Sequence, residues 1–178
     1  MPMIYLYGLK WNKNPKYLRP VDAMTEAQAR AAWADPSAVF SVSAGPDLEP
    51  GKVPDFTITA GVNERVIMDR YQPTGRLASS YSYQAETTIR DGSQLFLCQV
   101  DLWRADKTYS TYSYQPDGSG RTMVWEGDEH VVYAFSGLDV SGNWLKPGLS
   151  WGDWERVGYH EPDYLPLDPR QGTEIARN

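Results

Sequence analysis

The residues best suited to chemistry are one cysteine, two histidines and a run of carboxylates. A catalytic cysteine needs a partly exposed, electropositive setting with a histidine nearby. Cys98 lies in an apolar run and alternates in phase with Phe96, Val100 and Leu102, which indicates a position in the core. The sequence also has no Gly-x-Ser-x-Gly elbow, so we predict no catalytic residue.

Metal binding is not indicated either, because neither His130 nor His160 has a second histidine or a cysteine at ligand spacing. The segment Glu126–His130 gathers three carboxylates and an imidazole, but it lacks the alternating ligands of a calcium loop. We interpret it as a polar turn between two strands. An acidic contact patch containing Asp128 and Glu129, or a catalytic acid–base pair, is the alternative. No metal and no cofactor is predicted.

The segment from Gly142 to Glu155 has the most distinctive composition, with three tryptophans among glycines and acidic residues. Packing over the end of a sheet is one interpretation. Recognition is the other, because Trp and Tyr are enriched at the energetic centres of protein interfaces. Aromatic residues near Asp and Asn also suit sugar binding, so the segment does not separate the two kinds of ligand.

The chain contains one internal repeat, in which residues 80–84 (Ser-Tyr-Ser-Tyr-Gln) recur as residues 111–115 with Thr in the first place. Two matched hairpins would produce this offset without a repeat array. Both copies are interpreted as exposed or half-exposed strands rich in tyrosine. Tyr112 and Tyr114 in the second copy are therefore candidate anchors for a partner.

Composition and charge narrow the class of partner. The 178 residues include 17 basic and 23 acidic side chains, giving a net charge of −6 that opposes binding to nucleic acid. The same charge would attract a basic protein. The first residues lack the features of a signal peptide, and no apolar run is long enough to cross a membrane. We therefore expect a cytoplasmic protein without a membrane partner.

The elements that must position these residues are mostly short strands. A helix is predicted over Thr25–Ala34, with a capping box formed by Thr25 and Gln28, and Met24, Ala27, Ala31 and Ala34 are spaced to dock on a sheet. Hairpin turns are predicted at residues 72–75, at Asp91-Gly92 and at Asp117-Gly118. Runs typical of strands cover Met3–Trp11, Ala38–Ala44, Phe56–Ala60, Arg65–Tyr71, Leu77–Gln84, Thr87–Arg90, Gln94–Trp103, Tyr109–Gln115, Arg121–Glu126 and Val131–Phe135.

We therefore predict a mainly β protein: an antiparallel sheet, barrel or sandwich, with one N-terminal helix docked on it. Residues 1–178 are expected to form one domain. A proline-rich, extended tail should begin at about residue 160, and the last residues should fray.

In general character the chain resembles the immunity proteins of bacterial toxin systems: small, acidic, without a signal, rich in aromatic residues and without catalytic motifs. The resemblance implies a non-catalytic inhibitor that binds a basic toxin and occludes its active or binding surface. Alternatives are a small-molecule or sugar-binding β-barrel, a structural subunit of a phage or other assembly, and a barrel enzyme with dispersed acid–base residues. The candidate partner-binding residues are Tyr112, Tyr114, Asp128, Glu129, Trp144, Trp151, Asp153, Trp154 and Glu155.

Overall fold

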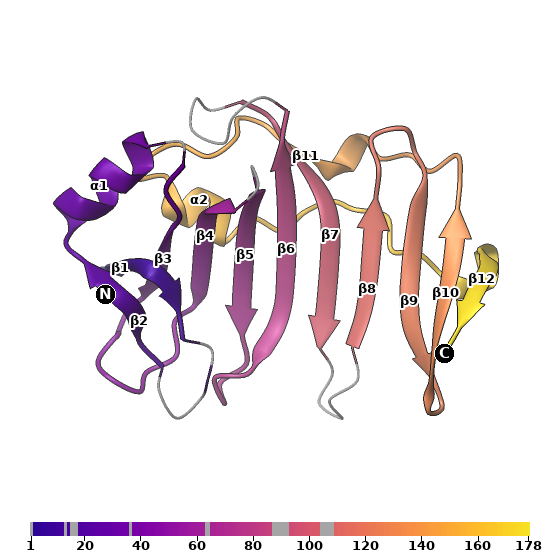
Figure 1. The fold of residues 1–178 in the computed structure, drawn as a ribbon, viewed down its shortest axis with the longest axis horizontal. Coiled ribbons are helices and arrows are strands. Elements are labelled where there is room, and N and C mark those ends of the chain that lie inside the picture. The colour runs from indigo at the N-terminus through magenta and orange to yellow at the C-terminus, as the bar shows by residue number, and fades with distance from the viewer. Residues whose placement is uncertain are drawn as a thin grey trace.

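The computed structural model describes residues 2–12, 14, 18–35, 37–62, 65–86, 93–103 and 109–178. Within these residues, twelve β-strands form one antiparallel sheet (Figure 1). The predictions at Asp91-Gly92 and Thr87–Arg90 lie outside the described residues. The strands are β1 (Ile4–Trp11), β2 (Pro20–Met24), β3 (Phe40–Gly45), β4 (Phe56–Val62), β5 (Arg65–Tyr71), β6 (Leu77–Ala85), β7 (Leu95–Trp103), β8 (Tyr109–Tyr114), β9 (Gly120–Glu126), β10 (Glu129–Phe135), β11 (Trp144–Leu145) and β12 (Thr173–Arg177).

The prediction of a mainly β protein with an antiparallel sheet is confirmed, but the sheet is open, so the barrel and sandwich alternatives are wrong. Strands β3 to β10 follow one another in chain order, β1 lies between β2 and β3, and β12 pairs with β10. The end strands β2 and β12 do not pair with each other, and the described strands make no second sheet. Short alternating strands with tight turns form in open and closed sheets alike, so the sequence pattern could not distinguish them. The described strands therefore enclose no barrel interior.

Strand register divides the sheet into an apolar face and a polar face. Cross-strand pairs connect the residues of one row on the apolar face: Val42, Ile58, Met68, Tyr81, Val100 and Tyr112. A parallel row on the polar face consists of Ser43, Thr57, Asp69, Ser80, Asp101 and Thr111. Because neighbouring residues of a strand point to opposite faces, this alternation gives the sheet one face for a core and one face for polar contacts.

The apolar face is covered by two helices and by a C-terminal excursion of the chain (Figure 1). An outward segment (residues 137–151) passes the ends of β9, β8 and β7, and its Trp151 ring stacks on Tyr7 of β1. Helix α2 (Trp154–Gly158) then sits on β3 and β4, where Trp154 is 1% exposed. A return segment (residues 159–172) crosses back to β10 and leads through a short 3-10 helix, η2 (Pro169–Gln171), into β12.

Helix α1 (Glu26–Ala34) confirms the predicted helix and its capping box: the Gln28 amide N–H donates to the Thr25 hydroxyl and the Thr25 amide N–H donates to the Gln28 side chain. It follows β1 and β2, so it is not an N-terminal element of the fold. Of the predicted docking face, Met24 packs against the core, but the three alanines do not. Ala29, Ala32 and Trp33 face the sheet, whereas Ala27, Ala31 and Ala34 are exposed. The ring of Trp33 packs on Phe40 and Trp154, and burying this large side chain sets the rotation of the helix.

The turns and the C-terminus give mixed outcomes. The hairpin turns at residues 72–75 and at Asp117-Gly118 are confirmed, and Gly75 and Gly118 both have positive φ angles. Residues 160–168 contain no helix or strand, in agreement with an extended tail. The last residues do not fray, however, because β12 pairs with β10. No helix in the described part of the chain is long and apolar enough to cross a membrane.

Candidate functional site

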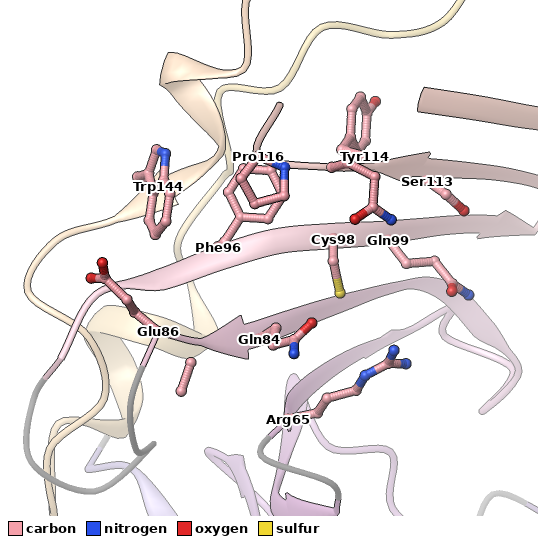
Figure 2. Close-up of a pocket in the computed structure, with 12 residues that line it drawn as sticks. Arg65, Gln84, Glu86, Phe96, Cys98, Gln99, Ser113, Tyr114, Pro116 and Trp144 are labelled. Atoms are coloured by element: carbon pink, nitrogen blue, oxygen red, sulfur yellow. The ribbon is translucent and has the colours of Figure 1, made fainter. Parts of the chain in front are cut away.

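A hollow of about 620 Å³ lies on the polar face, at the ends of β5 to β8 where β11 joins the sheet (Figure 2). Every one of these strands contributes a side chain, including Arg65 from β5 and Ser113 from β8. Its complete lining is Arg65, Gln84, Ala85, Glu86, Phe96, Cys98, Gln99, Ser113, Tyr114, Gln115, Pro116 and Trp144.

A second hollow, of about 540 Å³, continues the first towards β9 and β10. The two hollows share Ser113 and Gln115, and the second adds Arg121 and Ala134 from the next two strands. We call the two together the groove. It runs across the strands and not along them, so its chemistry depends on which residues the strand register brings side by side.

A β-bulge in β7 shapes the floor of the groove. Ser82 pairs with Gln99 and Tyr83 pairs with Leu97, so Cys98 is an extra residue on β7. The bulge shifts the alternation: Val100 faces the core, whereas Cys98 points into the groove (Figure 2). The prediction that Cys98 shares the phase of Val100 is therefore wrong.

The environment of Cys98 does not activate its thiol. The sulfur lies 3.3 Å from the Ser82 carbonyl oxygen and donates a hydrogen bond to it. Burial raises the pKa of the Cys98 thiol, and the nearby Arg65 charge only partly opposes this effect. The thiol is therefore protonated at neutral pH, the form that is a poor nucleophile.

One end of the groove is an aromatic wall. Strand β8 pairs with β7 only from Gln99 onwards. The first residues of β7 pair with β11 instead. Trp144 consequently lies opposite Phe96, with ring centroids 5.0 Å apart, and the Lys146 ammonium group lies 5.6 Å from the Trp144 ring. The Asn143 side chain holds this corner by donating a hydrogen bond of 3.0 Å to the Leu97 carbonyl.

The rest of the groove is rich in neutral groups that both donate and accept hydrogen bonds. Gln99 donates through Nε2 to Asp101, at 2.8 Å, which leaves its Oε1 as an acceptor for a ligand. Thr111 donates to the other oxygen of the same carboxylate, at 2.7 Å, so the Asp101 carboxylate is occupied within the protein. Gln84, Gln115 and Ser113 add further donors and acceptors to the groove.

The internal repeat was the sequence signal for this site, but only the strand register shows which of its residues face the groove. The two copies lie on β6 and β8, which flank β7 and run in the same direction. In both copies the tyrosines enter the apolar face, while the glutamines, Gln84 and Gln115, line the groove. The interpretation of both copies as exposed or half-exposed strands is wrong for Tyr81, Tyr83 and Tyr114, which are buried, but it holds for the half-buried Tyr112.

Of the sequence-predicted site residues, only Trp144 and Tyr114 line the groove, and Tyr114 belongs mainly to the core. The Tyr114 hydroxyl donates a hydrogen bond to the Leu165 carbonyl. Tyr112 is half-buried under the return segment, with its ring 6.4 Å from that of Tyr164. Both tyrosines therefore hold the return segment on the apolar face.

A second group of predicted residues lies around α2. Trp154 is a core residue, and the half-buried Trp151 ring packs against it with centroids 5.2 Å apart. Asp153 forms an ion pair with Arg156, and Glu155 accepts a hydrogen bond of 2.5 Å from the Tyr5 hydroxyl. In this conformation Trp154 is not accessible to a partner.

Asp128 and Glu129 lie at a third place, the tight turn between β9 and β10, which confirms the prediction of a polar turn. Arg177 of β12 forms ion pairs with Glu129, at 3.1 Å, and with Glu126, at 3.2 Å. The structure therefore separates the predicted site residues into distant groups and does not bring them together.

The polar face carries a further aromatic cluster that the sequence interpretation missed. Trp103, Tyr109, Trp125 and His130 lie at the opposite ends of β7 to β10 from the groove. The Trp125 and His130 ring centroids are 3.7 Å apart, and Trp125 is 37% exposed. Cross-strand pairing of His130 with Trp125 brings them together, and this pairing could not be read from the sequence without the register.

No protein-family model, curated protein sequence or solved structure matches this chain. Among the described residues, no three His, Cys, Asp or Glu side chains are grouped so that they could hold a metal ion. The groove on the polar face is therefore the candidate site on its own geometry.

Proposed function

We propose that this chain is a protein-binding module of the inhibitor type, like an immunity protein, and that a segment of its partner occupies the groove. The observation that carries the proposal is the composition of the groove: three glutamine and two serine side chains, in a groove that crosses β5 to β10. Amide groups match the alternating N–H and C=O groups of a polypeptide backbone, because each one both donates and accepts.

Other ligand classes fit this composition less well. A phosphate group needs donors only, whereas the groove also presents the Gln99 Oε1 acceptor and the Glu86 carboxylate. A sugar ring would have to stack on Trp144, but Phe96 and the Lys146 ammonium group already lie against that ring. These contacts favour a polypeptide over the sugar-binding alternative.

The acidic charge of this protein has to be considered at long range and at contact with the partner. The net charge of −6 favours encounter with a basic protein from a distance. At contact range, three of the four acidic residues predicted to face that partner already have partners within the chain: Glu129 with Arg177, Asp153 with Arg156, and Glu155 with Tyr5. Steric occlusion through the groove, and not these acidic groups, is therefore the mechanism that we propose for inhibition.

Co-purification with a groove-blocking variant tests the proposal. Ser113→Trp places a large side chain where the two hollows meet, and Ala31→Trp is the matched control on the exposed side of α1. We expect a protein from the native host to co-purify stoichiometrically with the tagged wild type and with Ala31→Trp, and to be lost with Ser113→Trp. Circular dichroism would verify that both variants are folded.

A growth assay then tests inhibition. The captured protein, expressed alone, should arrest growth, and co-expression of the wild type should restore growth while Ser113→Trp should not. Equal capture by Ser113→Trp would remove the groove from the interface. The absence of any stoichiometric partner from cells shown to make the neighbouring gene products would refute a protein-binding function.

A further inference from the structure

Two arginines lie on opposite sides of the groove, in neighbouring rows of cross-strand pairs that are offset by two residues on β6, because Gln84 pairs with Phe96 and Ser82 pairs with Gln99. Arg65 of β5 pairs with Gln84 of β6, and Arg121 of β9 pairs with Ser113 of β8, which itself pairs with Gln99 of β7. Four strand spacings separate β5 from β9. At about 4.8 Å per spacing, the backbones of the two arginines lie about 19 Å apart across the strands, and the offset of two residues, about 7 Å along the strands, brings their separation to about 20 Å.

Arg65 and Arg121 differ from most of the other arginines in that they form no ion pair with a described residue of the chain. Arg70, Arg156, Arg170 and Arg177 each form an ion pair with a carboxylate of the chain. Within the described residues, Arg65 and Arg121 form no ion pair and no side-chain hydrogen bond, although the chain has more acidic than basic residues.

The local charge of the groove is therefore opposite in sign to the charge of the whole protein. Among the described residues, Arg65 and Arg121 line the groove together with a single carboxylate, Glu86, which lies near the aromatic wall (Figure 2). The remaining polar lining is neutral. An anionic group on a ligand would thus find two guanidinium groups, each able to bind a carboxylate through two parallel hydrogen bonds.

We infer that the occupant of the groove is an extended, acidic segment of a partner protein, with two carboxylates that meet Arg65 and Arg121. An extended chain rises about 3.3 Å per residue, so a gap of about 20 Å corresponds to roughly six residues. Between the two carboxylates, Gln84, Gln99, Gln115 and Ser113 pair with the backbone of the segment. This inference rests on the proposed function and adds the chemistry of the segment that is bound.

Two pools of fluorescein-labelled octapeptides test the inference. One pool has Glu at positions 1 and 7 with mixed residues between them, and the other has Gln at these positions. Binding to the wild-type protein is measured by fluorescence anisotropy at low and at moderate salt. We expect the Glu pool to bind at least about tenfold more tightly, and we expect salt to weaken that preference because it rests on charge.

Three substitutions locate the preference. Arg65→Gln and Arg121→Gln should each remove most of the difference between the pools. Arg76→Gln removes the same charge from an exposed position in the β5–β6 turn, at the other end of β5, and should leave the difference intact. A third pool, with the two Glu residues only three positions apart, should bind more weakly than the first because it cannot reach both arginines.

Equal binding of the Glu and Gln pools, no detectable binding, or an equal loss with Arg76→Gln would each overturn the inference. The proposed function fails separately. If a partner co-purifies and Ser113→Trp abolishes its capture while the pools bind equally, the groove binds protein but does not select acidic segments. If the Glu pool is preferred but no protein partner depends on Ser113, the groove binds carboxylates and the inhibitor function is refuted.

Discussion

The hydroxyl group of Tyr114 donates a hydrogen bond of 2.7 Å to the carbonyl oxygen of Leu165, 51 residues later in the chain. Tyr114 belongs to β8 and is 1% exposed, and its ring also lies against Tyr164. Burial raises the pKa of Tyr114 above its ordinary value, so the hydroxyl remains a donor at every physiological pH. One buried side chain thus fixes the middle of the return segment to the sheet.

Replacing Tyr114 by Phe should lower the free energy of unfolding by about 1 kcal/mol, because a hydrogen bond is lost while the ring is kept. Tyr112→Phe is the matched control two residues earlier on the same strand, where the hydroxyl makes no hydrogen bond to a described residue; its effect should be below about 0.5 kcal/mol. Urea unfolding monitored by tryptophan fluorescence would measure both. Equal effects would show that the Leu165 contact does not stabilise the fold.

Arg70 holds the start of the return segment. Its guanidinium group donates to the carbonyl oxygens of Gly158, at 3.2 Å, and His160, at 2.8 Å, and it forms an ion pair with Glu161. Arg70→Met should cost about 2–3 kcal/mol of unfolding free energy, because charge-assisted hydrogen bonds in a largely buried setting are lost.

Glu161→Gln is the control for Arg70→Met, since it removes only the charge of a side chain that is 72% exposed. Its cost should stay below about 1 kcal/mol, as for other exposed ion pairs. A cost for Glu161→Gln as large as that for Arg70→Met would mean that the ion pair, and not the two backbone carbonyls, holds the segment.

Trp154→Ala should destabilise the fold by about 3–5 kcal/mol, because it leaves a large cavity between α2 and the apolar face. The structure thus assigns to the core a residue that the sequence placed among the contacts of a partner. Trp125→Ala is the control on the polar face, where the ring is 37% exposed, and it should cost clearly less. Thermal unfolding followed by circular dichroism would compare them, and similar losses would place Trp154 outside the core.

The stability of the protein should fall between pH 7.5 and pH 5.5 through His160. Burial, followed by the positive charges of Arg156 and Arg70, lowers the pKa of His160 below the ordinary value of 6.5. In this range the unfolded chain binds more protons than the folded protein, so the unfolding free energy decreases as the pH falls. His160→Gln should flatten the dependence measured by urea unfolding at several pH values; an unchanged slope would assign it to other groups.

Local features of the fold could be predicted from the sequence because short-range chemistry determines them. The capping box of α1 depends on two residues three positions apart, and the turns at Gly75 and Gly118 depend on glycine tolerating a positive φ. The alternation of apolar and polar residues along the strands could be predicted for the same reason. Whether the sheet closes depends on how strand twist and stagger accumulate over many strands, and no short window of sequence contains that information.

The candidate site could not be predicted because it is a product of register. Arg65 and Arg121 are 56 positions apart in the chain, and only the pairing of β5 to β9 places them on the same face, beside the same groove. The bulge at Cys98 further reversed the facing that simple alternation had implied. Tryptophans misled for a related reason: their enrichment at interfaces is equalled by their value in cores, and only burial separates the two uses.

The out-and-back course of the C-terminal excursion has a consequence for synthesis on the ribosome. Strands β3 to β10 pair in the order in which they are made, so the sheet can assemble while the chain is still growing. Its apolar face, however, is closed by Trp154 and Leu167, which emerge last. A growing chain therefore exposes a bare apolar surface until its final residues appear, and any premature stop after β10 would leave a sheet prone to aggregation.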